Sequence, residues 1–131
     1  MDRRSILREY YIAIKSKIKI ARFDSAISSI DKLLYNCPND EWGYYYKGVC
    51  EFALEKYQLA MKYFAIAIQI NPAFGKAYFN LGICFYLSRK LDLALINFAK
   101  ALVIFTKQRE LDKKRRCIDA IKMVEAVRRS K

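Results

Sequence analysis

The sequence contains no histidine, and it has only four glycines and two prolines among 131 residues. Without histidine, the usual general base and the commonest nitrogen ligand for zinc are missing. Few glycines and prolines leave few breaks, and no strand-like alternation persists, so we expect an all-helical chain. Lysine or arginine interrupts every helix-sized apolar window, so no segment reaches the roughly 20 apolar residues that cross a membrane.

Sequence signals of catalysis and targeting are also missing. The chain has no glycine-rich phosphate loop and no nucleophile elbow, and its charged start leads into no apolar stretch with a cleavage site. Glu51 and Glu55 lie four residues apart, but we expect them to be exposed charges near Lys47 and Lys56. We therefore expect no enzymatic activity, no cofactor, no bound metal and a cytoplasmic location.

The four cysteines show no C-x2-C spacing. They are Cys37, Cys50, Cys84 and Cys117. Cys50 and Cys84 are 34 residues apart, and packed helices place their axes about 8–10 Å apart, farther than the roughly 7 Å that a disulfide allows between Cα atoms. We expect both to be small, buried, free thiols, as in a reducing compartment.

A 34-residue repeat organises the chain between residues 41 and 106. The identical pairs are Tyr44 and Tyr78, Gly48 and Gly82, Cys50 and Cys84, Leu59 and Leu93, Ala60 and Ala94, Phe64 and Phe98, Ala65 and Ala99, and Ala67 and Ala101. A fainter copy precedes them, in which Pro38 corresponds to Pro72. The chain therefore carries three copies in one register.

These columns resemble the tetratricopeptide repeat (TPR), whose pattern is W-x2-L-G-x2-Y, then A-x3-F, then a closing proline. The third copy fits best, with Tyr78, Leu81, Gly82, Phe85, Ala94, Phe98 and Ala101. The second copy departs at Lys47 and Glu51, and the first has Ile14 in place of the small glycine. The resemblance implies a right-handed α-solenoid of antiparallel helix pairs, with about seven helices in a single domain over residues 1–131.

The repeats are expected at about residues 7–40, 41–74 and 75–106, with a C-terminal helix at about 107–129. Apolar spacing predicts helices near residues 7–20, 23–35, 41–54, 57–70, 75–87 and 91–105. The apolar face of the final helix has two interpretations. It caps the third helix pair, because repeat arrays need a cap, or it is offered to another protein.

The net charge of +12 is concentrated at the two ends of the chain. Residues 1–24 hold seven basic and three acidic residues (net +4), and residues 107–131 hold ten and four (net +6). The middle of the chain is nearly neutral. An acidic protein, a nucleic acid or an anionic membrane surface would each suit this charge, and so would a purely solubilising role.

The resemblance also implies a concave groove lined by the first helix of each pair. The residues expected there are Arg8, Tyr11, Lys15, Lys19, Trp42, Tyr45, Val49, Phe52, Lys76, Phe79, Ile83 and Tyr86. We expect the neighbouring column, Tyr10, Tyr44 and Tyr78, to be buried. The groove would have an aromatic floor with positive charge at both ends, similar to TPR chaperones of bacterial secretion systems that hold an apolar segment. The lysine and asparagine clamp of family members that bind chaperone tails is expected to be absent.

Three functions follow from these expectations. The first is a non-enzymatic adaptor or chaperone-like module that binds a peptide with apolar and acidic residues in the groove. The second is a basic helical module that binds nucleic acid or another polyanion through the C-terminal helix. Its contacts would be Lys113, Lys114, Arg115, Arg116, Arg128 and Arg129. The third is self-association, as a homo-oligomer, through the same groove.

Overall fold

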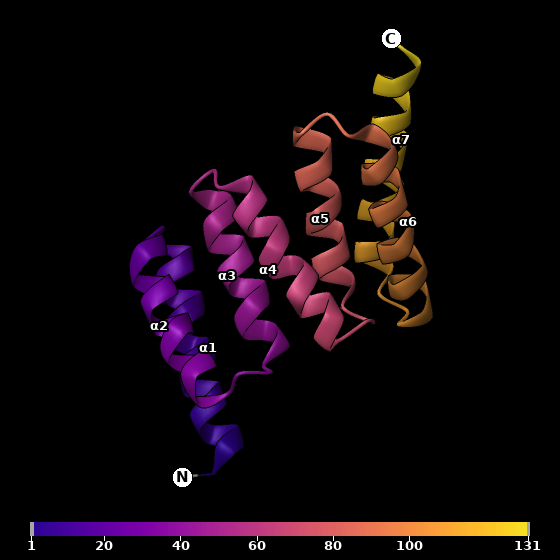
Figure 1. The fold of residues 1–131 in the computed structure, drawn as a ribbon. Helices are drawn as coiled ribbons and strands as arrows, with labels where there is room; N and C mark the ends of the chain where they lie inside the picture. Colours follow the sequence, from indigo (N-terminus) through magenta and orange to yellow (C-terminus); the bar gives the residue numbers. More distant parts are fainter. Residues whose placement is uncertain (1, 131) are drawn as a thin grey trace. The chain divides into compact units, whose positions relative to one another are not determined.

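The computed structural model describes residues 2–130, which form helices connected by short turns (Figure 1). The helices are α1 (Arg3–Lys19), α2 (Phe23–Asn36), α3 (Glu41–Ala53), α4 (Tyr57–Ile70), α5 (Gly75–Leu87), α6 (Leu91–Lys107) and α7 (Leu111–Arg129). No strand occurs in the described residues, so the all-α prediction is confirmed. The chain divides into two compact units, unit 1 up to Ile70 and unit 2 from Asn71.

The start of α1 differs from the sequence prediction. The helix begins at Arg3, whereas the apolar spacing predicts a start near Leu7. Asp2 explains the difference, because its Oδ1 accepts the backbone N–H of Ser5 at 2.8 Å and caps the helix. The last helix begins at Leu111, about one turn later than predicted. The α2 to α6 bounds lie within about two residues of the predicted ones.

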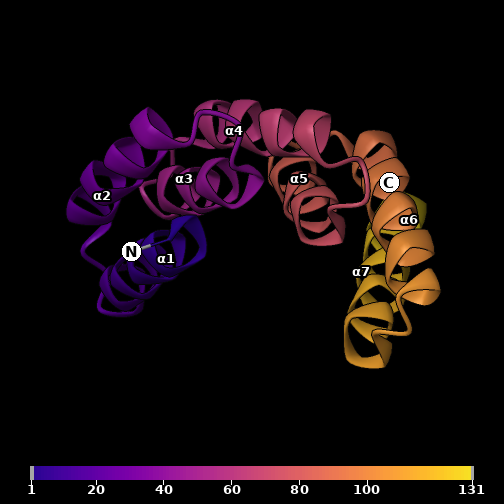
Figure 2. The same cartoon turned by 90° about the horizontal axis from the view of Figure 1, so that it is seen from below.

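Unit 1 consists of two antiparallel helix pairs, α1 with α2 and α3 with α4 (Figure 1). Viewed along the helices, α1 and α3 form one layer of this unit, and α2 and α4 form the other (Figure 2). A core of buried side chains joins α1, α2 and α3. Its members are Ile14, Ala26, Ile30, Leu33, Cys37, Tyr46 and Cys50.

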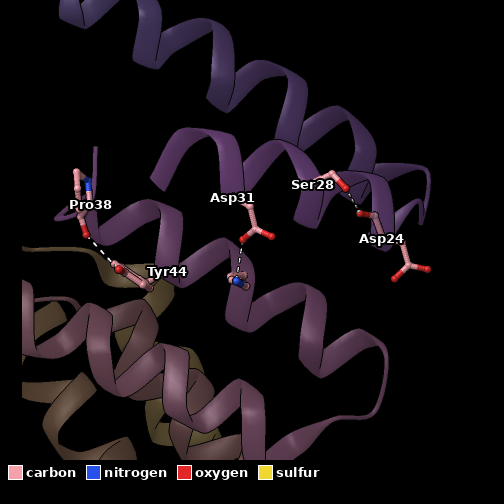
Figure 3. A network of polar contacts seen from close by, with 6 residues as sticks. Asp24, Ser28, Asp31, Pro38 and Tyr44 are labelled. Atoms are coloured by element: carbon pink, nitrogen blue, oxygen red, sulfur yellow. Dashed lines mark hydrogen bonds and ion pairs between the residues drawn. The ribbon is translucent and has the colours of Figure 1, made fainter. Parts of the chain in front are cut away.

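Polar contacts connect α3 to α2 and to the turn between the two helices (Figure 3). The Lys47 Nζ lies 2.7 Å from Asp31 Oδ1 and 4.8 Å from the centroid of the Tyr63 ring. The Tyr44 hydroxyl donates to the Pro38 carbonyl at 3.1 Å. An exposed ion pair adds little stability, so these contacts mainly set how the two helices are aligned.

Unit 2 consists of the α5 and α6 pair with α7 packed against α6. Two buried clusters hold it together, one formed by Ala94, Phe98 and Val124 and the other by Ala101, Phe105 and Cys117. Cys117 and Val124, both on α7, have no exposed surface. The apolar face of α7 is therefore covered by its own chain, which favours the capping interpretation over a face offered to another protein.

The repeated glycines allow close packing of each helix pair. A Cβ atom on Gly48 would lie 2.6 Å from Phe64 Cε1, and one on Gly82 would lie 2.6 Å from Phe98 Cε1. Ala60 and Ala94 are fully buried. The repeat columns thus mark where an aromatic ring of the second helix lies directly against the backbone of the first.

The turns inside the helix pairs use a left-handed residue that is never glycine. Ala21, Glu55 and Arg89 have φ angles of 61°, 62° and 60° and recur every 34 residues. Each turn ends its helix with the two hydrogen bonds of a Schellman motif. In the second turn, for example, the Lys56 N–H donates to the Glu51 carbonyl at 2.9 Å and the Glu55 N–H donates to the Phe52 carbonyl at 2.9 Å. A left-handed residue other than glycine costs about 1–2 kcal/mol, and the hydrogen bonds of the turn offset part of it.

Two expectations about burial are wrong. Tyr10, Tyr44 and Tyr78 are half-buried, and the ring of Tyr78 lies 5.7 Å beneath Lys100 Nζ. Each of these tyrosines carries a hydroxyl that needs a polar partner, which keeps it near the surface. Glu51, expected to be an exposed charge, is only 5 % exposed.

None of the described helices is long and apolar enough to cross a membrane.

Candidate functional site

Four aromatic side chains of α1 and α3 form one cluster in unit 1. They are Tyr11, Trp42, Tyr45 and Tyr46, hereafter the aromatic cluster. The Trp42 ring lies 5.6 Å from Tyr45, edge to face, and 5.8 Å from Tyr46, while Tyr11 lies 6.2 Å from Tyr46. The local cause is helical spacing, because residues 42, 45 and 46 of α3 share one face.

Asp40 connects the aromatic cluster to the start of α3. Its Oδ1 accepts the Tyr11 hydroxyl at 2.6 Å, and its Oδ2 accepts the Gly43 N–H at 2.9 Å. Burial, and then this carboxylate, raise the pKa of Tyr11 well above its ordinary value. Burial, with smaller contributions from Tyr45 and Asp40, raises the pKa of Tyr46 to about 12. Both phenols are therefore neutral at physiological pH.

Asp40→Ala is expected to lower the free energy of unfolding by about 1–2 kcal/mol, because α3 loses its N-cap. It should also lower the pKa of Tyr11, since one of the groups that raise it is removed. Urea unfolding and absorbance titration of the tyrosines measure the two effects. Asp40→Asn keeps a capping oxygen and an acceptor for Tyr11, so its stability should stay within about 0.5 kcal/mol of the wild type. Equal losses for both variants would contradict this role.

Cations and apolar side chains of α1 surround a cavity next to the aromatic cluster. The cavity is open to solvent and has a volume of about 640 Å³, and its lining consists of Asp2, Arg4, Ser5, Leu7, Arg8, Tyr11, Ile12 and Lys15, with three cations and one carboxylate among them. Arg8 and Lys15 are exposed, and neither forms an ion pair with another residue in the range 2–130. Three of the predicted groove residues therefore lie together here, while the exposed Lys19 lies one turn beyond Lys15 on α1 and does not line the cavity.

The other predicted residues of unit 1 lie on α3. Trp42 and Tyr45 are half-buried and pack against the core of the unit, and the Tyr45 ring is 5.9 Å from Phe64. Val49 and Phe52 are also half-buried, and the Phe52 ring lies 5.2 Å from Tyr57. These residues are both packed and partly exposed, as the residues of an anchored contact surface are.

The four predicted residues of unit 2 lie on α5 and are half-buried. They are Lys76, Phe79, Ile83 and Tyr86. Phe79 lies 5.2 Å from the Phe98 ring, and Ile83 and Tyr86 pack against the cluster that contains Val124. These three apolar side chains thus contribute to the core of unit 2 as well as to its surface.

The basic residues of α7 do not gather on one face. Lys113, Lys114, Arg115 and Arg116 are consecutive, so each points about 100° away from the last. Lys113 lies 3.7 Å from Glu110 and 5.8 Å from the centre of the Phe105 ring, and Arg128 lies 3.4 Å from Asp92. Arg129 is exposed. Within the described part of the chain, no group of three potential metal ligands lies together.

Sequence reasoning missed two residues of the site. Tyr46 is only 9 % exposed and contacts all three other rings of the aromatic cluster. Its spacing of four residues from Trp42 was the available signal. The Asp40 carboxylate was also missed, although an aspartate directly before a predicted helix is a typical N-cap.

Buried thiols give the chain a predictable response to alkaline pH. Burial raises the pKa of Cys50 from 9.0 to about 12, and that of Cys84 and of Cys117 from 9.0 to about 11. The unfolded chain loses these protons first, so the stability is complete below about pH 9 and falls as the pH rises towards 11 to 12. Urea midpoints at pH 8 and at pH 10.5 should show the fall, and Cys50→Ala should reduce it. An unchanged midpoint would refute the prediction.

The expectation of free thiols is confirmed, since all four cysteines are free and buried.

No protein-family model matches the chain, and no curated protein matches it. Many solved structures do match. The type III secretion translocator chaperone SycD of Yersinia enterocolitica has a TM-score of 0.88 at 14% identity, covering 98% of this chain and 90% of SycD.

Two further structures are similar over almost the same length. PcrH in complex with the chaperone-binding region of PopD has a TM-score of 0.88 at 17% identity, covering 95% of each chain. The TPR2B domain of yeast Sti1, in a complex with pHsp70, has a TM-score of 0.84 at 16% identity, covering 91% of this chain and 95% of that domain. The chain therefore has the fold of the tetratricopeptide-repeat proteins, an α-solenoid of antiparallel helix pairs.

Proposed function

We propose that the chain is a non-enzymatic protein-interaction module, adaptor or chaperone-like, that binds a peptide segment of another protein. The contacts are the predicted groove residues on α1, α3 and α5. Apolar side chains of the segment contact the aromatic rings, and its acidic residues face Arg8, Lys15, Lys19 and Lys76.

The aromatic cluster carries this proposal. Trp42 and Tyr45 are held edge to face at 5.6 Å and anchored against the core, while both residues stay partly exposed. Such rings lose little conformational entropy on binding, and Trp and Tyr are the side chains most enriched at binding hot spots. The adjacent cavity on α1, with exposed Arg8 and Lys15, supplies positive charge for an acidic residue.

The similar structures support the same reading. PcrH binds the chaperone-binding region of PopD, and the Sti1 domain forms a complex with pHsp70. A fold that holds segments of other proteins in two separate cases is a suitable scaffold for such a role here. The four free cysteines suit a reducing compartment, so we place the protein in the cytoplasm.

A pull-down from lysate tests the proposal, using the wild type beside a variant with Trp42→Ala, Tyr45→Ala and Phe79→Ala. A matched control carries Ile20→Ala, Tyr35→Ala and Met123→Ala, three exposed apolar residues outside the predicted groove. Circular dichroism checks that all three proteins are folded. We expect a protein that the wild type and the control capture and the aromatic variant loses.

The alternatives predict different results in the same experiment. Material that all three proteins capture, and that nuclease treatment removes, would show that the basic residues of α7 bind nucleic acid and that the proposal is wrong. Wild-type and control chains that form oligomers, with the aromatic variant monomeric, would show self-association through the same residues. A light-scattering measurement of molar mass separates that case.

A further inference from the structure

Three exposed apolar side chains form a stripe on the outer face of α6. Leu93, Ile96 and Val103 are 41, 49 and 52 % exposed. The opposite face of α6 carries the buried Phe98 and Phe105, and Leu91 and Leu95 pack against the cluster shared with α7. The stripe is thus the face of α6 that neither α5 nor α7 uses.

The other repeats show that the fold does not need apolar residues in these columns. In the position of Ile96, the first repeat has Ser28 and the second has Lys62. In the position of Val103 the first repeat has Tyr35 and the second has Gln69, and in the position of Leu93 the second repeat has Leu59. All three polar residues are exposed, on helices with the same role in their pairs. Only α6 therefore combines apolar residues in all three columns, and Ile96 is the member of the stripe that neither other repeat shares.

The spacing of the stripe is that of a coiled-coil seam. Leu93, Ile96, Lys100, Val103 and Lys107 follow one another at intervals of three, four, three and four residues. From Leu93 to Val103 the helix rises about 15 Å, roughly two to three turns. A second helix lying along α6 matches this geometry, because helical partners dock through apolar anchors at the same spacing of three and four residues.

The charge of the α6 seam indicates which kind of partner helix it would bind. The seam carries Lys100 and Lys107, and the single acidic residue of α6, Asp92, lies 3.4 Å from Arg128. A second copy of the chain would bring its own lysines to this basic face, in a protein of net charge +12. A helix with acidic residues beside its apolar seam complements the face instead.

We propose that the outer face of α6 is a second docking site, separate from the predicted groove residues on α1, α3 and α5, that binds an amphipathic helix of another protein. The bound helix places apolar residues on Leu93, Ile96 and Val103 and acidic residues beside Lys100 and Lys107. The protein can then hold two partner segments at once, one on each surface.

The test uses a synthetic helix of three heptads with leucine at a and d and glutamate at e and g, labelled with fluorescein. The glutamates keep the peptide from pairing with itself. Its affinity is measured by fluorescence anisotropy for the wild type and for Ile96→Ser with Val103→Gln, which introduces residue types that other repeats tolerate. A matched control, Ile20→Ser with Met123→Gln, removes exposed apolar surface elsewhere. Urea unfolding confirms that the variants remain folded.

We expect the wild type and the matched control to bind the acidic helix, with the dissociation constant raised at least about tenfold in the stripe variant. The same peptide with lysine in place of glutamate should bind much more weakly to all three proteins. Absence of binding to the wild type, or equal binding to the stripe variant, would overturn the proposal.

Two other outcomes would also overturn it. Loss of binding in the Trp42, Tyr45 and Phe79 variant, but not in the stripe variant, would place the helix on the predicted groove residues. A wild-type dimer that the stripe variant converts to a monomer would show that a second copy covers α6. Light scattering at several protein concentrations detects the dimer.

Discussion

Phe98→Ala is expected to lower the free energy of unfolding by about 3–5 kcal/mol. The ring is 1 % exposed and lies at the centre of unit 2, against Gly82, Ala94, Val124 and Phe79. Alanine removes the buried apolar surface and leaves a cavity that helices on both sides cannot fill. Equilibrium urea unfolding, followed by circular dichroism, measures the loss. It is a large share of the 5–15 kcal/mol that stabilises a typical domain.

A matched set of variants links this effect to the packing of Phe98 on Gly82. Gly82→Ala alone should destabilise the protein by about 1–3 kcal/mol, because the added Cβ would lie 2.6 Å from the ring. In a Phe98→Leu background the same change should cost less, since the smaller side chain leaves room. Val103→Ala, on the exposed face, should change stability by less than about 0.5 kcal/mol. Additive effects of Gly82→Ala and Phe98→Leu would contradict this account.

Trp42→Ala is expected to weaken binding of the partner segment by about 2 kcal/mol, which is about 30-fold in the dissociation constant. The indole packs against both Tyr45 and Tyr46, so its removal takes away one contact and loosens two neighbours. Calorimetric titration of the captured segment gives the affinity.

Tyr35→Ala is the control for this effect, because Tyr35 is 87 % exposed and lies on α2, outside the predicted groove. Its affinity should equal that of the wild type. The Trp42 effect should persist when the salt concentration is raised, because apolar contacts are not screened, whereas binding to nucleic acid weakens steeply. A Trp42→Ala variant with wild-type affinity would remove the aromatic cluster from the binding surface.

Much of the fold could be predicted from the sequence because the repeat aligns three helix pairs against one another. Gly48 and Gly82, with Phe64 and Phe98, identify the helix crossings, and Pro38 and Pro72 identify the breaks between pairs. Each column is under the same packing constraint twice, so one copy confirms the other. The observed α2 to α6 bounds accordingly lie close to the predicted ones.

The features that escaped prediction leave no signal in the apolar spacing of the sequence. The Asp2 side chain caps α1 through one hydrogen bond, so the helix begins earlier than the apolar spacing predicts. The left-handed conformation of Ala21, Glu55 and Arg89 is imposed by the turn inside each helix pair. A glycine at these positions would have indicated it in the sequence. Glu51 is buried where the next repeat has Phe85, so its burial follows from its column although its charge suggests exposure.

For the candidate site, the sequence indicated which helix face carries each side chain but not how deeply that side chain packs. The resemblance to the repeat family assigns Tyr11, Trp42 and Tyr45 to the groove face of first helices. The sequence does not distinguish a solvent-exposed ring from one that packs against the core, as Phe79 packs against Phe98. The hydrogen bond from Tyr11 to Asp40 joins residues 29 positions apart, beyond the reach of local patterns.

The sole tryptophan of the chain, Trp42, lies within the aromatic cluster, so its fluorescence reports directly on the proposed binding surface. Titration of the captured segment should shift the emission to shorter wavelength and protect the indole from acrylamide quenching, with saturation at the calorimetric dissociation constant. An oligonucleotide should leave the emission unchanged. Saturable binding by calorimetry without any change in the emission or quenching of Trp42 would contradict the claim that the aromatic cluster binds the segment.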